Sequence, residues 1–73
     1  MSGTERQIDF SMFLIYRLAR SWGRSVPEVY RALDESGALR DYVIPFYDVL
    51  HTMGEESLVE DVTEYVRARG VDA

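Results

Sequence analysis

The only histidine of the chain, His51, lies in a stretch whose residue types could do chemistry. On a helix, Tyr47 and Asp48 precede it by four and three residues, so either side chain can reach its ring. An Asp48–His51 pair is typical of a general base or a proton switch. The same spacing suits a structural histidine that closes a short helix, favoured by the helix dipole or hydrogen-bonded to a carbonyl. No Ser or Thr is placed as a nucleophile beside it, so we favour the structural interpretation.

No other pattern points to catalysis or to a cofactor. The chain has no Cys and a single His, which excludes disulfides, thiolate zinc sites and imidazole-rich metal sites. It has no glycine-rich phosphate loop and no nucleophile elbow. We therefore expect no catalytic residues, no metal, no cofactor and no small-molecule substrate. The chain is predicted not to be an enzyme.

A second group of candidate residues lies on one flank of the first expected helix, away from its predicted core stripe. Aromatic and arginine side chains are enriched at binding hot spots, and this flank carries both. One interpretation is a docking surface for a protein partner or a second copy; the other is that another helix covers the flank. The candidate partner-binding residues are Phe10, Phe13, Leu14, Arg17, Arg20 and Arg24.

The elements that position these side chains are predicted to be helices. A capping box at residues 4–7 begins the first, which Gly23 ends, and a second capping box at 25–28 begins a helix that Gly37 ends. The predicted apolar faces are Ile8, Met12, Ile15, Ala19 and Trp22 on the first helix, and Val26, Val29, Tyr30 and Leu33 on the second.

The segment around Pro45 is expected to change direction. A proline disfavours helical dihedrals at the residue before it, here Ile44, so we expect a turn over residues 39–44. A short helix then runs from Pro45 to Thr52.

A fourth helix is predicted to follow residues 52–55, and we expect these residues to cap its start. Gly70 is expected to end it. Its predicted apolar residues are Leu58, Val59, Val62, Tyr65 and Val66. Its acidic run, Glu55, Glu56, Glu60, Asp61 and Glu64, is either a solvated face or a surface that meets a cationic partner.

These elements together predict one all-α domain, a small bundle of three longer helices plus one short helix. Residues 1–4 and 71–73 are expected to fray. A chain of 73 residues has a small core, so its stability depends on good packing or on association. We therefore expect a protein partner or a homodimer.

Charge and hydropathy bear on the remaining classes of partner. A net charge of −5 disfavours binding to the phosphate backbones of nucleic acids. The second and third helical segments could nevertheless imitate a helix-turn-helix. A small DNA-binding regulator is therefore the alternative function. No apolar run is long enough to cross a membrane, and the first ten residues lack the features of a signal peptide. We expect a cytoplasmic location.

Part of the chain resembles a known family. The pattern Y-x-x-L-H-T at 47–52, followed by an acidic helix ending in R-x-R-G, is similar to domain-of-unknown-function family 3791, as are S-V-P-E-V-Y-R-A-L and S-G-A-L-R-D-Y. The resemblance runs from Phe10 to Gly70, and its most specific residues are Tyr47, Leu50 and His51. Members are small bacterial proteins without an assigned activity, often encoded beside proteins that look like ADP-ribosyltransferases. The resemblance thus implies a neutralising or regulatory partner, such as an antitoxin.

Overall fold

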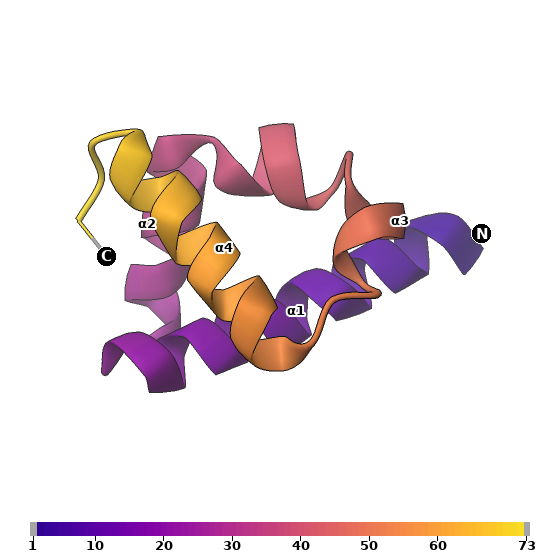
Figure 1. Ribbon diagram of the computed structural model, residues 1–73, viewed down its shortest axis with the longest axis horizontal. Coiled ribbons are helices and arrows are strands. Elements are labelled where there is room, and N and C mark those ends of the chain that lie inside the picture. The colour runs from indigo at the N-terminus through magenta and orange to yellow at the C-terminus, as the bar shows by residue number, and fades with distance from the viewer. Residues whose placement is uncertain (1, 73) are drawn as a thin grey trace.

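The computed structural model describes residues 2–72, with side chains from residue 5 onward, and these residues form helices without any strand (Figure 1). The prediction of an all-helical chain with three longer helices is confirmed. A π-helical segment, here called η1, accompanies the short helix. The elements in chain order are α1 (Ser2–Trp22), α2 (Val26–Ser36), η1 (Leu39–Val43), α3 (Tyr47–Leu50) and α4 (Glu55–Ala68).

Helix α1 begins at Ser2, so the predicted capping box at residues 4–7 is wrong. Nothing in residues 2–4 forbids helical dihedrals, and the helix therefore extends further toward the N-terminus than its apolar stripe suggested. Residues 2–4, which were expected to fray, are helical. At the other end Val71 packs against the core, while residues 1 and 73 lie outside the described part of the chain.

Helix α2 has the predicted capping box. The Ser25 hydroxyl accepts a hydrogen bond from the Glu28 amide at 3.3 Å, and the Ser25 amide donates to the Glu28 carboxylate at 2.9 Å. The backbone N–H and the hydroxyl of Ser25 together lower the pKa of Glu28. Gly37 ends the helix in the left-handed region at φ 77°, where a residue without Cβ is favoured.

The turn expected over residues 39–44 is wrong, because this segment is helical. The Ile44 amide donates to the Leu39 carbonyl at 3.0 Å, a π-helical bond, and Ile44 keeps helical dihedrals of φ −70° and ψ −50° before Pro45. The next amide, Phe46, donates back to the Tyr42 carbonyl at 3.0 Å. These two hydrogen bonds lie on either side of Pro45. They offset the preference of the residue before a proline, here Ile44, for extended backbone dihedrals.

The short helix α3 exists as predicted but is limited to Tyr47–Leu50, with hydrogen-bonded turns on both sides. The expected cap of α4 from the 52–55 sequence is wrong. The Thr52 hydroxyl donates backward to the Val49 carbonyl at 2.7 Å, and Gly54 occupies the N-cap position with no side-chain hydrogen bond. Thr52 thus closes α3 instead of opening α4.

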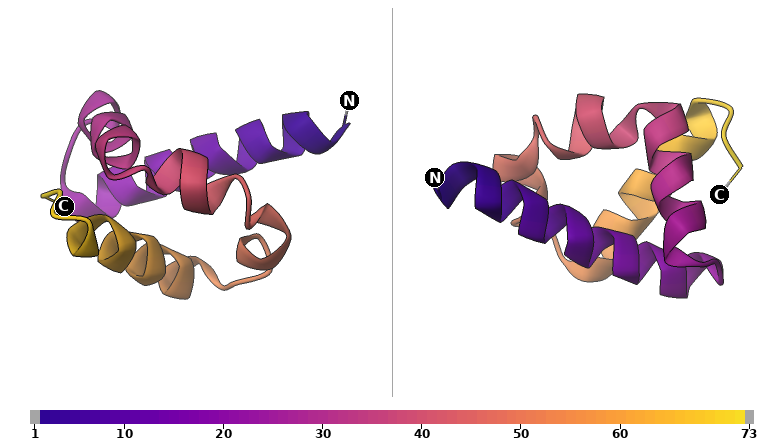
Figure 2. Two further views of the ribbon diagram at one scale, coloured as in Figure 1. Left: turned by 90° about the horizontal axis from the view of Figure 1, so that it is seen from above. Right: turned by 180° about the vertical axis from the view of Figure 1, so that it is seen from behind.

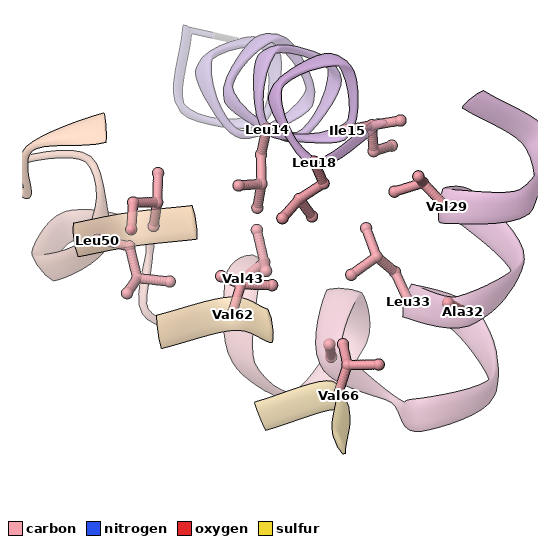
Figure 3. Packing of buried hydrophobic residues seen from close by; sticks show 12 residues of the cluster. Leu14, Ile15, Leu18, Val29, Ala32, Leu33, Val43, Leu50, Val62 and Val66 are labelled. Carbon is pink, nitrogen blue, oxygen red and sulfur yellow. The ribbon is translucent and has the colours of Figure 1, made fainter. Parts of the chain in front are cut away.

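The helices enclose one hydrophobic core, shown in Figure 3. Leu14 and Leu18 of α1 point toward residues of α2, η1 and α4, and both are fully buried. An indole hydrogen bond from Trp22 to Thr63, at 2.9 Å, joins the end of α1 to α4. The other buried hydrophobic residues are Ile15, Val29, Ala32, Leu33, Ala38, Val43, Leu50, Leu58, Val62 and Val66.

The predicted core stripe of α1 is wrong in its first half. Ile8 and Met12 are 57% and 44% exposed, whereas Ser11 lies in the buried stripe with Leu14 and Leu18. The Ser11 hydroxyl donates to the Gln7 carbonyl at 2.8 Å, so this polar group is satisfied within the helix. On α2, similarly, Tyr30 is half exposed instead of facing the core.

The N-terminal half of α1 projects beyond the rest of the fold (Figure 2). The segment from η1 to α3 lies above this half, and α4 crosses the C-terminal half (Figure 1). Within residues 2–72 no helix combines the length and the hydropathy that a bilayer span requires.

Candidate interaction surfaces

The predicted Phe/Arg flank of α1 is used largely inside the molecule. Leu14 has no exposed surface and is a core residue, which corrects its assignment to a docking surface. The Phe10 ring is partly buried and meets Tyr47 edge-on, with 5.3 Å between ring centroids. Of the two phenylalanines, only Phe13 stands out from the surface, at 42% exposure. The flank is therefore covered by α3 at its N-terminal end.

The arginines of this flank face carboxylates of the same chain. Arg17 forms an ion pair with Glu55 at 2.9 Å, and Arg24 pairs with Asp72 at 3.1 Å. Arg20 is exposed and has no ion pair within the described residues. The groove between α1 and α4 is lined by Arg17, Arg20, Ser21, Glu55, Glu56, Val59 and Glu60. The acidic run of α4 and the arginines of α1, predicted as separate features, thus form opposite walls of one groove.

The structure positions His51 as the C-cap residue directly after the short helix α3. Its Nδ1 lies 2.7 Å from the Tyr47 carbonyl oxygen, to which it donates, and its ring stacks on Tyr47 with 4.6 Å between centroids. Asp48 is exposed and makes no hydrogen bond or ion pair with any residue described here. The contacts of His51 are thus those of the structural interpretation, and the predicted Asp48–His51 pair does not form.

An apolar group that the sequence did not single out lies beside His51. Val49 is 61% exposed and Phe46 is half exposed, three residues apart on the same helical turn. Ile44 is also exposed, just before Pro45. We call Ile44, Phe46 and Val49 the α3 surface. In the sequence, this surface is visible only as apolar side chains around a proline. The fold shows that Val43 and Leu50 fill the core while Ile44, Phe46 and Val49 face outward.

A second apolar surface lies on α1, on the side away from the core. Ile8, Met12 and Tyr16 follow one another at intervals of four residues and are 57%, 44% and 56% exposed, with Phe13 beside them. We call Ile8, Met12, Phe13 and Tyr16 the outer face of α1. Two of its residues, Ile8 and Met12, were predicted for the core together with Ile15, Ala19 and Trp22, of which the last three do pack there.

An aromatic stack joins η1 to α4. The rings of Tyr42 and Tyr65 lie parallel with centroids 4.6 Å apart, and the Arg69 guanidinium lies 5.4 Å from the Tyr65 centroid. The Tyr42 hydroxyl donates to the Asp61 carboxylate, and this bond raises the pKa of Tyr42 to about 12. The Phe46 ring lies at the outer end of the stack, with 5.7 Å between its centroid and that of the Tyr42 ring. The α3 surface is thereby anchored to α4.

The segment after Gly37 bears on the helix-turn-helix that was the alternative to an interaction module. Its two helical elements, η1 and α3, contain five and four residues and are separated by the turn at Pro45. A recognition helix must be long enough to lie in a groove and present several side chains, and neither element has that length.

Comparison with known proteins gives a family and no function. The family model described as protein of unknown function (DUF3791) matches residues 9–69, which contain the α3 surface and most of α1. Neither the curated proteins nor the solved structures contain a significant match.

Proposed function

We propose that this protein, which belongs to the family DUF3791, is a non-enzymatic interaction module that acts by occupying another protein. The observation that carries the proposal is the exposure of apolar side chains. Among the described residues, eight large hydrophobic side chains are more than a third exposed, against twelve hydrophobic residues in the core. Seven of the eight fall into two groups, the outer face of α1 and the α3 surface, and exposed apolar side chains that are grouped in this way mark sites that bind another macromolecule.

The α3 surface is the part that we assign to the partner. Val49 and Phe46 present an aliphatic and an aromatic anchor on one turn, a combination suited to a pocket on another protein. The turn is held in place before binding, because Phe10 packs against Tyr47 and the Tyr47 ring stacks on His51. A surface that is already ordered loses less conformational entropy on association.

The family resemblance supports a more specific form of the proposal. In this form the partner is an ADP-ribosyltransferase-like protein encoded nearby, and the module neutralises or regulates it by docking. Of the α3 surface, Val49 lies within the Y-x-x-L-H-T segment at 47–52, at one of its unspecified positions, and Phe46 and Ile44 come just before that segment.

Co-expression of the module with the protein encoded beside it tests this proposal. Val49→Asp places a carboxylate in the centre of the α3 surface, and we expect the affinity measured by titration calorimetry to fall at least about tenfold. The matched control is Tyr30→Ser on α2, where a side chain of similar exposure is removed away from this surface. Binding by Val49→Asp at the strength of the unchanged protein would refute the assignment.

A further inference from the structure

The outer face of α1 is a second apolar surface, separate from the α3 surface, and its arrangement identifies what covers it. Ile8, Met12 and Tyr16 form a continuous stripe, because residues four apart lie above one another on a helix. In the view from behind, α1 runs in front of the other segments over most of its length (Figure 2). Four large side chains, including Phe13, are thus available to a partner.

Charges of opposite sign border this stripe at its two ends. Glu5 and Asp9 lie at the N-terminal end, and Arg20 lies at the C-terminal end. All three side chains are exposed, and none forms an ion pair or hydrogen bond with a residue in the described part of the chain. Arg20 lies at the edge of the outer face, where it also lines the α1–α4 groove, but unlike Arg17 and Arg24 it forms no ion pair within the described residues.

We propose that the outer face of α1 binds the same face of a second copy, with the two helices antiparallel. A two-fold interface brings a surface against itself, so it must be self-complementary in shape and in charge. With Met12 near the axis, Ile8 of one copy lies opposite Tyr16 of the other, each being four residues from Met12. The acidic end of each helix then meets the Arg20 end of the other.

Charge selects this orientation over the alternative. In a parallel pair, Glu5 and Asp9 would face their own counterparts and Arg20 would face Arg20, so the contacts of these three side chains would be repulsive. The antiparallel pair converts the same groups into two symmetrical sets of opposite charges. The flexible Met12 can fill the contact at the axis, and the Tyr16 ring can pack while its hydroxyl stays in water.

Sedimentation equilibrium of the full chain tests the proposal, and we expect a dimer at roughly 10–100 µM. Met12→Glu places two carboxylates at the axis and should give a monomer whose circular dichroism spectrum remains helical. Arg31→Glu, which changes an exposed arginine on α2, is the control and should remain dimeric. A monomeric unchanged protein, or a Met12→Glu variant that dimerises as strongly, would overturn the inference.

Charge reversal tests the orientation without touching the apolar contacts. Glu5→Arg and Arg20→Glu should each raise the dimer Kd at least about tenfold, because each creates like-charged ends. An equimolar mixture of these two variants should form a heterodimer more strongly than either variant self-associates. In that mixture the new charges face each other, and the unchanged Arg20 of one copy meets the unchanged Glu5 of the other. A mixture no stronger than its components would exclude the antiparallel pair.

The same variants separate this inference from the proposed function. Val49→Asp changes the α3 surface and should leave dimerisation unaffected, while Met12→Glu should leave the partner site intact. If either variant lost both dimerisation and partner binding, the two surfaces would be one site. That result would refute the proposal of a separate dimer face.

Discussion

Tyr42 is the residue whose environment differs most from what the sequence suggested. It was expected only as part of a turn, yet its hydroxyl donates to Asp61 and its ring stacks on Tyr65 of α4. Asp61 was expected only as one charge of an acidic run. The sequence places these residues on separate elements and carries no signal that they meet, because side-chain contacts between distant elements depend on how the helices cross. The stack therefore belongs to the features that sequence could not predict.

The raised pKa of Tyr42 gives a prediction in alkaline solution. The folded protein keeps the Tyr42 proton to a pKa of about 12, whereas the unfolded chain loses it near 10. Stability from this group is therefore complete below pH 10 and is lost as the pH rises from 10 to 12. We expect one of the five tyrosines to ionise late in an ultraviolet titration of the folded protein, and Tyr42→Phe to remove that late phase.

The same substitution bears on stability at neutral pH. Tyr42→Phe deletes one hydrogen bond and keeps the ring stack, so urea unfolding should show a loss of about 1 kcal/mol. A variant that unfolds like the unchanged protein at pH 8 and still shows the late tyrosine would contradict the assignment of this bond.

At the scale of the element, the apolar stripe of α1 was predicted wrongly in its first half and correctly in its second. Both sides of this helix carry apolar residues, and the prediction placed Ile8 and Met12 in the core, whereas Ser11 is the residue that is buried there. A serine that donates to the carbonyl four residues before it can be buried at little cost, since its polar group needs no partner from outside the helix.

Ser11→Ala tests this explanation. The hydroxyl makes its hydrogen bond within its own helix, and alanine has the higher helix propensity, so we expect the free energy of unfolding to rise by about 0.5 kcal/mol. Leu14→Ala in the same stripe should lower it by about 2–5 kcal/mol, because it leaves a cavity in the core. Denaturant titrations of both variants provide the measurement. A marked loss of stability in Ser11→Ala would mean that the serine has a structural role beyond its helix.

Local signals predicted the elements better than their packing. The α2 boundaries follow from Ser25 and Gly37, because capping and left-handed dihedrals depend on neighbouring residues alone. The helical dihedrals at Ile44 could not be predicted, since they depend on two bonds that flank a proline. His51 was assigned to a helix end from the residues of its own segment. The burial of Leu14 could not be predicted in that way, because it depends on the positions of α3 and α4.

At the scale of the molecule, the acidic run of α4 left open a surface that meets a cationic partner. The fold changes this expectation, because Glu55 of the acidic run pairs with Arg17 across the α1–α4 groove. The α3 surface itself carries no charged side chain, and Asp48 is the carboxylate next to it in the sequence. Under the proposed function, docking at the α3 surface would depend mainly on apolar contact, which salt screens little.

The salt dependence of association therefore distinguishes the α3 surface from the acidic face of α4. Stopped-flow binding to the partner should show an on-rate that changes less than about threefold between roughly 50 and 500 mM salt. Glu60→Gln and Glu64→Gln, on the acidic face, should alter the rate no more than this. If the on-rate instead falls steeply with salt and these substitutions reduce it, then the acidic face of α4 guides the encounter and the α3 surface is not the main docking site.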